Sequence, residues 1–545
     1  MLQPPLSPHA ADGALARVEK YVDLLVTVAY IDGLYHPRER AFIQRHLDNA
    51  GLLTSTPPAV LAATYARLEA EVAKLSAEVM SSGDNAYLPT RLKVRALELF
   101  GSFSPGDQAT ALELVRALMH VDGMISQSEH LLHDELMAYF TAPVPPAAAL
   151  PTAAAAPMRI EPARPKPLHA VDHALLAPLE QTYSPHPVEL HAQLARDYQL
   201  VEHAMAQWQR QRGLGHGRLA GVTDIAQLPV GARFLDGFVY VQRPAHPIEL
   251  IVLGDLHGCY GCLKAALLQS DFINRAWAHQ WDPARYPDVK LVLLGDYIDR
   301  GRFSFDGVLR AVLQLFVAMP EQVIVLRGNH EYFLATDRVV WSGVHPAEAL
   351  ASITPHVPFE LLDAYRRLFE QMPTSFLCDR TLFVHGGVPR DDSFAARYHD
   401  LASLNDGELR FQMLWSDPSD TEHVPVELQR QDARFSFGRR QFRAFMERLG
   451  CTTMIRGHEK IDRGFDVVYD LGDRLLLNLF SAGGHDNRDL PEGASYRSVT
   501  PMALTIHHGA GAPVAQPWAI DYRPFNHPPH NGLHRVAPLL EFRYG

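Results

Sequence analysis

The sequence predicts a multidomain protein in which an all-α region precedes an α/β domain, and three observations lead to this fold class. Apolar residues recur with helical spacing from about Leu15 to Tyr139, as in VEKYVDLLVTVAYIDG. A stretch rich in proline and alanine then interrupts the pattern between Pro143 and Pro167. Beyond it, the apolar runs IELIVL, VKLVLL and QVIVL have the length and composition of buried strands.

Length and composition set the broad class of the protein. A chain of 545 residues is too long for one hydrophobic core, so two to four domains are expected. The hydrophobic fraction of 47% and the charged fraction of 21% are those of an ordinary globular protein. The net charge of −12 argues against a dedicated nucleic-acid binder.

The same sequence predicts a cytoplasmic protein without a membrane segment. No apolar run has the length needed to cross a bilayer, and the N-terminus lacks the basic and apolar parts of a secretory signal. Only four cysteines occur, which is too few for a disulfide framework and is typical of a reducing compartment. Cys259 and Cys262 form a CxxC with no second pair to complete a zinc site, so we expect small buried thiols.

The N-terminal region, residues 1–142, contains an internal repeat. YIDGLYHPRE (Tyr30–Glu39) and HVDGMISQSE (His120–Glu129) align 90 residues apart and pair Asp32 with Asp122 and Glu39 with Glu129. Turn formation and helix capping explain the pattern best. Divalent cation binding by the paired acids is the alternative. The pattern resembles TerB-like helical domains, which implies a module for interaction or sensing that could bind a protein partner.

The remaining boundaries follow from changes in composition. Residues 143–169 read as an extended linker, because proline at this density prevents a continuous helix. A helical lead-in is expected over residues 170–236, which contain VELHAQLARDYQLVEHAMAQWQRQ. Strands beginning with GFVYVQ open the main domain, residues 237–509, and residues 510–545 read as an irregular tail rich in proline and histidine.

Five short polar motifs lie in order along the main domain. They are GDLHG (Gly254–Gly258), GDYIDRG (Gly295–Gly301), RGNHE (Arg327–Glu331), HGG (His385–Gly387) and RGHE (Arg456–Glu459). The first three directly follow predicted strands, and α/β proteins place their chemistry at the carboxyl ends of strands. One such motif alone is as readily a structural turn, but five in order indicate a functional site.

The side chains in these motifs suit a particular chemistry. Carboxylate, amide and imidazole groups are the ligands that Mn²⁺ and iron prefer. Two divalent ions about 3.5–4 Å apart lower the pKa of a bridging water and neutralise phosphoryl oxygens. Glycines beside the polar residues permit tight turns from strand to helix. The motifs therefore favour metal-dependent hydrolysis of phosphate esters.

The five motifs resemble those of the phosphoprotein phosphatases, metallophosphoesterases with a calcineurin-like phosphoesterase domain. LWSDPSD (Leu414–Asp420) and LFSAGG (Leu479–Gly484) resemble two further segments of that family. The resemblance extends from about Ile248 to Ala503. It implies two stacked mixed β-sheets flanked by helices and the activity of a phosphatase.

The resemblance also implies a dinuclear metal site, with Mn²⁺ expected and iron or zinc as alternatives. Metal-bound hydroxide would attack the phosphate, His330 would protonate the leaving oxygen as general acid, and Asp299 would orient His330. Asp296 would be shared between the two ions. The full set of metal ligands would be Asp255, His257, Asp296, Asn329, His385 and His458.

Three residues are predicted to bind the substrate phosphate. Arg300 matches an arginine whose fork can hold two phosphoryl oxygens. A second arginine has two candidates, Arg430 and Arg434, and neither has the usual offset from the following Phe-Gly pair; we favour Arg434. His485 stands where the family often has tyrosine, so it is the third predicted contact.

Three functions fit these motifs. GDYIDRG followed by Ser304, together with LWSDP, favours a protein serine/threonine phosphatase acting on phosphoproteins or phosphopeptides. The same metal chemistry would also hydrolyse a nucleotide pyrophosphate such as diadenosine tetraphosphate. The third function is a sensor or scaffold that works mainly through the N-terminal helical domain.

Overall fold

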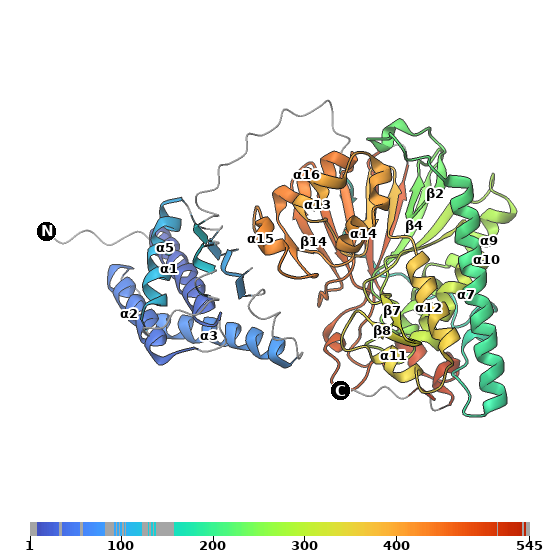
Figure 1. Cartoon of the computed structure of the whole chain (residues 1–545), viewed down its shortest axis with the longest axis horizontal. Coiled ribbons are helices and arrows are strands. Elements are labelled where there is room, and N and C mark those ends of the chain that lie inside the picture. The colour runs from blue at the N-terminus through green and yellow to red at the C-terminus, as the bar shows by residue number, and fades with distance from the viewer. Residues whose placement is uncertain are drawn as a thin grey trace. The chain divides into compact units, whose positions relative to one another are not determined.

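The computed structural model describes residues 8–31, 35–54, 58–81, 157–509, 511–536 and 539–540, with parts of residues 92–137 (Figure 1). The chain divides into two units. The first comprises Met1–Pro151 and Pro418–Gln441, and the second comprises Thr152–Asp417 and Phe442–Gly545. Residues 418–441 thus belong to the first unit, although they lie in the sequence between LWSD and RGHE.

Helices build the first unit, as the sequence predicts. They are α1 (Pro8–Ala29), α2 (Pro37–Thr54), α3 (Pro58–Ser81), α5 (Pro105–Met119) and, from the later segment, α15 (Val426–Gln429), next to the short strand β12 (Ser436–Phe437). Four of them begin at a proline, whose fixed φ and missing N–H suit the first turn of a helix. Helix α1 contacts α2, α3 and α5. Its apolar residues, Val22 and Leu25 among them, are buried in one cluster with Val424 and Leu428.

The repeat in this unit is described only in part. Asp32, Asp122 and the glycines that follow them lie outside the described residues. The carboxylate of Glu39 accepts a hydrogen bond from the backbone N–H of His36 at 2.8 Å, which is a helix-capping contact at the start of α2. This contact supports the capping interpretation for Glu39. The TerB-like resemblance and the cation-binding alternative stay predictions.

Two mixed sheets form the frame of the second unit, as the family resemblance implies. The six-stranded sheet has the order β1 (Arg159–Ile160), β17 (Val514–Ala519), β16 (Met502–His508), β4 (Ile248–Leu253), β5 (Asp288–Leu293) and β6 (Val323–Val325). The seven-stranded sheet has the order β14 (Phe465–Asp470), β15 (Leu475–Leu479), β13 (Thr453–Arg456), β10 (Thr381–Val384), β9 (Ser375–Cys378), β3 (Val239–Gln242) and β2 (Arg233–Asp236).

Aliphatic side chains on both sheets share one core. Leu250, Val252 and Leu291 of the first sheet and Phe383 and Ile455 of the second belong to a single buried cluster. Strands β4, β5 and β6 are parallel neighbours, and each is an almost continuous apolar run, as expected when both faces of a strand are covered.

Helices flank these sheets. They are α7 (Pro187–Gly215), α8 (Tyr260–Gln269), α9 (Phe272–Trp281), α10 (Arg310–Ala318), α11 (Glu348–Ile353), α12 (Phe359–Gln371), α13 (Asp391–Arg397), α14 (Gly407–Met413) and α16 (Arg439–Leu449). The long helix α7 lies in the predicted lead-in and runs beside α10 and α12 (Figure 1). Its Trp208 is buried and stacks on Phe316 of α10 with ring centroids 4.8 Å apart. None of the helices that the structure describes is both long and apolar enough to cross a membrane.

Two strands lie where no regular structure was expected. Residues 159–160, in the predicted linker, form β1, which pairs in parallel with β17, and β17 itself lies in the predicted irregular tail. Proline flanks or interrupts both segments, and neither has a two-residue period that would mark a strand. Both strands obtain their ladder hydrogen bonds from neighbouring strands of the sheet, β17 from β16 and β1 from β17.

Candidate metal centre

The carboxyl ends of adjacent parallel strands bring the five motifs together. GDLHG, GDYIDRG and RGNHE follow β4, β5 and β6 of the first sheet. HGG and RGHE follow β10 and β13, which are parallel neighbours in the second sheet. A β-bridge between Asp255 and Phe480 joins the end of β4 to the end of β15. The motifs therefore share one edge, where the ends of the two sheets meet.

The loops at this edge have unusual backbone conformations. Positive φ angles occur at five of the predicted site residues, which are His257 (41°), Asp296 (55°), Asp299 (66°), Arg300 (64°) and His458 (69°). Non-glycine residues rarely adopt this region, and each such residue costs about 1–3 kcal/mol. Such strain persists where surrounding contacts over-determine the loop, which is typical of functional sites.

Glu331 supplies some of those contacts. Its buried carboxylate accepts hydrogen bonds from the backbone N–H groups of Asp296 (2.8 Å), Tyr297 (2.8 Å) and Gly328 (2.9 Å). These three bonds tie the loop after β5 to the loop after β6. At Gly295, φ is 113° and an added Cβ would collide with the backbone of Gly328, so only glycine fits there.

The first group of predicted ligands surrounds His257. Its Nε2 atom lies 3.5 Å from Oδ2 of Asp296 and 3.7 Å from Oδ2 of Asp255. Its Nδ1 atom lies 2.9 Å from the carbonyl oxygen of Ile298, and a carbonyl can only accept, so Nδ1 carries the proton. The lone pair of Nε2 is then directed at the two carboxylates.

The second group surrounds Asn329. Its Oδ1 atom lies 2.8 Å from Nε2 of His385 and 3.0 Å from Nδ1 of His458. Nε2 of His385 is also 3.3 Å from Oδ1 of Asp296. Two clusters that could each hold a metal ion thus contain Asp296, one with His257 and His330 and the other with His385 and His458.

These groups fit two divalent metal ions. Oδ2 of Asp255 is buried and has no hydrogen-bond partner among the residues that the structure describes, although Oδ1 accepts from the backbone N–H of His458 at 2.9 Å. Burial raises the pKa of Asp255 to about 7 and raises the pKa of Asp296 well above its ordinary value. Burial also holds the pKa of His257 and of His385 well below the ordinary value. Bound cations would compensate the buried carboxylates and coordinate the neutral imidazoles.

The predicted acid and its partner lie beside the ligands. Nδ1 of His330 is 2.7 Å from Oδ2 of Asp299, and Oδ1 of Asp299 accepts from the backbone N–H of Ala349 at 2.8 Å. Burial raises the pKa of Asp299 to about 6. The backbone N–H of His330 bonds Oδ1 of Asp296 at 3.0 Å, which fixes His330 relative to the ligand group.

Arg300 belongs to the same unit and is held at the site from one side. Its Nη1 atom donates to both carboxylate oxygens of Glu348 (2.9 and 3.1 Å) and to the carbonyl oxygen of Pro346 (3.2 Å). Glu348 begins α11, so the segment after the hairpin of β7 (Phe333–Thr336) and β8 (Val339–Ser342) positions this arginine. A guanidinium held in this way is suited to bind an anion.

Arg456 is a buried residue for which the sequence assigned no role. Its guanidinium donates to Asp417 at 2.8 Å, to Glu459 at 2.7 Å and to the carbonyl oxygen of Gly386. It therefore ties the LWSD, HGG and RGHE motifs together beside the second ligand group. Its position in the RGHE motif was the one sequence feature that could have drawn attention to it. A buried arginine needs several hydrogen-bond acceptors, so a structural role could have been expected.

The other two predicted phosphate contacts have different surroundings. Arg434 lies in the segment 418–441, which belongs to the first unit, and its role stays a prediction. His485 is exposed, and its carbonyl oxygen accepts a hydrogen bond from Arg497 at 2.7 Å. Tyr496, which the sequence did not single out, stacks on the ring of His257 instead. Tyr496 lies outside the motifs, so no local sequence pattern predicts its contact with His257.

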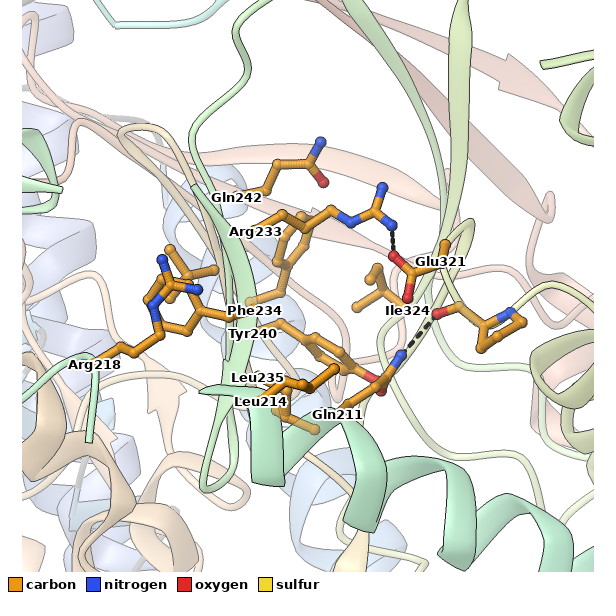
Figure 2. A pocket seen from close by; sticks show the side chains of 13 residues that line it. Gln211, Leu214, Arg218, Arg233, Phe234, Leu235, Tyr240, Gln242, Glu321 and Ile324 are labelled. Carbon is orange, nitrogen blue, oxygen red and sulfur yellow. Dashed lines mark hydrogen bonds and ion pairs between the residues drawn. The ribbon is translucent and has the colours of Figure 1, made fainter. Parts of the chain in front are cut away.

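The cavity in Figure 2 has a volume of about 290 Å³, and its lining residues lie outside the five motifs. Its walls come from α7, β2, β3 and the region before β6, and an ion pair between Arg233 and Glu321 borders it. None of its lining residues is a predicted ligand.

The CxxC prediction is confirmed, since Cys259 and Cys262 are free and buried.

Comparison with known proteins finds similarity to phosphoesterases over part of the chain. Residues 248–462 match the family model described as calcineurin-like phosphoesterase. A probable serine/threonine-protein phosphatase of Encephalitozoon cuniculi is 28% identical over 283 residues, which cover 51% of this chain and 55% of that protein. The serine/threonine-protein phosphatase 6 catalytic subunit of Caenorhabditis elegans is 28% identical over 199 residues, which cover 34% of this chain and 54% of that protein.

The chain thus spans about half the length of the curated relatives that it matches. Among solved structures, a protein serine/threonine phosphatase from Saccharomyces cerevisiae aligns with 59% of this chain and 89% of its own. The sequence identity in that alignment is 16% and the TM-score is 0.40.

Proposed function

We propose that this chain, whose residues 248–462 match the calcineurin-like phosphoesterase family model, is a metal-dependent protein serine/threonine phosphatase. The observation that carries the proposal is the shared carboxylate of Asp296 between two clusters of potential ligands. Two divalent ions held there would supply an activated water and neutralise the phosphoryl oxygens. The expected metal is Mn²⁺, with iron or zinc as alternatives.

The residues of the chain divide the remaining work between them. The metal ligands would be Asp255, His257, Asp296, Asn329, His385 and His458. Arg300 would bind the phosphate and orient it. His330 would donate a proton to the leaving oxygen, and Asp299, at 2.7 Å from its Nδ1, would hold the imidazole in position.

A β-hairpin next to the site favours a protein substrate. Strands β7 (Phe333–Thr336) and β8 (Val339–Ser342) directly follow RGNHE, and the segment after β8 reaches Arg300 through Glu348. Leu334 and Trp341 are directly opposite each other and are 50% and 56% exposed. An exposed apolar surface of this kind can bind the side chains of a peptide, whereas a small phosphate ester does not need it.

The test compares substrates under identical conditions with the Mn²⁺-loaded full chain. We expect turnover of p-nitrophenyl phosphate and of phosphoserine and phosphothreonine peptides, with the peptides preferred over diadenosine tetraphosphate. Asp296→Asn, which removes the shared carboxylate, is the inactive control. Turnover of wild type no higher than that control would refute the enzymatic function. A preference for diadenosine tetraphosphate would replace the protein phosphatase with a nucleotide pyrophosphatase.

A further inference from the structure

The ring of Tyr496 is fixed directly on a predicted metal ligand. It stacks on the imidazole of His257 with ring centroids 5.2 Å apart and an angle of 29° between the planes. It also forms a T-shaped contact with the ring of Phe480, with centroids 5.2 Å apart. A tyrosine held between two rings has little rotational freedom, so its hydroxyl occupies a defined place.

That hydroxyl points toward the site. It lies 3.4 Å from Nε2 of His257, the ring nitrogen whose lone pair faces the carboxylates of Asp255 and Asp296. The guanidinium of Arg300 lies near the phenol, since burial raises the pKa of Tyr496 and the positive charge of Arg300 lowers it. Tyr496 and Arg300 therefore present neighbouring donors at the same edge of the ligand cluster.

The surrounding loop holds Tyr496 in this place. It lies in the short helix η5 (Ser495–Ser498), and the next residue, Arg497, donates to three carbonyl oxygens, those of Pro491 (2.7 Å), His485 (2.7 Å) and Leu490 (2.6 Å). Ser498 donates to Oδ1 of Asp462 at 2.8 Å. Hydrogen bonds within the loop that follows β15 therefore hold Tyr496 in position.

We propose that Tyr496 binds the substrate phosphate, donating its hydroxyl hydrogen to a phosphoryl oxygen next to Arg300. The assignment rests on the proposed phosphatase function and gives the site a phosphate donor that is not part of the five motifs. A phenolic hydroxyl can donate a hydrogen bond. A phosphate monoester dianion offers only acceptors, so a phenol and a guanidinium complement it.

The loop of Tyr496 also contains His485, which was predicted to contact the phosphate. The loop containing it runs through the place where the family resemblance predicted a phosphate contact, yet its side chain is exposed. Tyr496 reaches the ligand cluster from eleven residues further along the same loop. The phosphate contact is therefore assigned to Tyr496 in place of His485.

The experiment measures orthophosphate binding to Mn²⁺-loaded full-length protein by calorimetry, with metal content determined on the same samples. Tyr496→Phe keeps the ring and removes only the hydroxyl, so we expect orthophosphate affinity to fall about tenfold with metal content unchanged. Tyr286→Phe, at an exposed tyrosine outside the five motifs, is the matched control and should bind orthophosphate as wild type does. The KM for a phosphopeptide should rise in Tyr496→Phe in parallel with the loss of orthophosphate affinity.

Three results would overturn the assignment. Wild-type orthophosphate affinity in Tyr496→Phe would limit Tyr496 to packing, while wild-type turnover in the same assay would leave the phosphatase function intact. Loss of Mn²⁺ from Tyr496→Phe, with unchanged orthophosphate affinity per occupied site, would make Tyr496 a metal ligand instead. Absence of both orthophosphate binding and turnover in wild type would refute the proposed function together with this assignment.

Discussion

The Nδ1 atom of His330 lies 2.7 Å from Oδ2 of Asp299, and both side chains are buried at the edge where the two sheets meet. The second oxygen of Asp299 accepts from the backbone N–H of Ala349 at 2.8 Å. The carboxylate is thus fixed on both sides, and the imidazole keeps its Nε2 atom directed into the site. This arrangement is what a positioned general acid requires.

His330→Asn should lower the turnover number by about 10²–10⁴-fold while Mn²⁺ content stays close to that of wild type. The loss is that of a general acid, because the leaving oxygen would have to take its proton from water. Steady-state kinetics with a phosphopeptide and metal analysis check this. His399→Asn changes an exposed histidine and should be silent. If His330→Asn also lost metal, His330 would be a ligand.

Arg300→Lys should reduce kcat/KM by about 10–100-fold, although the positive charge is kept. Lysine cannot reproduce the planar fork that would bind two phosphoryl oxygens, and it cannot match the bonds of Arg300 to Glu348 and Pro346. Arg302→Lys is the matched control, because Arg302 is exposed two residues away. Equal kcat/KM values for the two variants would remove Arg300 from the phosphate site.

The metal-free protein should respond to pH through Asp255. Burial raises the pKa of this carboxyl from 3.8 to about 7, so the folded state holds a proton that the unfolded state releases. The protonated carboxyl of Asp255 therefore stabilises the folded state. This contribution to the free energy of unfolding is fully present below pH 3.8 and is lost as pH rises through about 7. Asp255→Asn should therefore gain stability relative to wild type between pH 5 and pH 7.5 when EDTA is present, by at most about 1.4 kcal/mol per pH unit.

Urea denaturation at several pH values measures this difference. With Mn²⁺ present, wild type should be more stable than Asp255→Asn, because wild type then gains the binding energy of a metal that needs the ionised carboxylate. If the difference in free energy of unfolding between the two metal-free proteins did not change with pH, the raised pKa of Asp255 would be contradicted.

The β7–β8 hairpin should affect peptide substrates alone. Trp341→Ala removes the largest exposed apolar side chain of the hairpin, so we expect KM for phosphopeptides to rise severalfold and KM for p-nitrophenyl phosphate to stay unchanged. Trp281→Ala on α9 is the control, since Trp281 is 89% exposed. A parallel change for both substrates would mean that the hairpin supports the catalytic site and does not bind peptide.

The predicted ligands could be located from the sequence because each follows its strand within a few positions. Asp255 and Asp296 come directly after β4 and β5, so hydrophobic runs and motif glycines locate them without knowledge of the fold. The helices of the first unit were predictable for the same reason, since their apolar period is local. β1 was not, because two residues beside prolines acquire strand structure only by pairing with β17.

Local sequence therefore predicted the candidate ligands and the class of chemistry, since strand period, turn glycines and side-chain type all act over a few residues. Contacts between distant segments decided the rest. Glu331 organises the loop of Asp296 across two strands, Tyr496 reaches His257 from a loop 239 residues later, and residues 418–441 belong to the helical unit. No local period encodes such approaches, because they depend on the paths of whole loops and on which buried polar groups find partners.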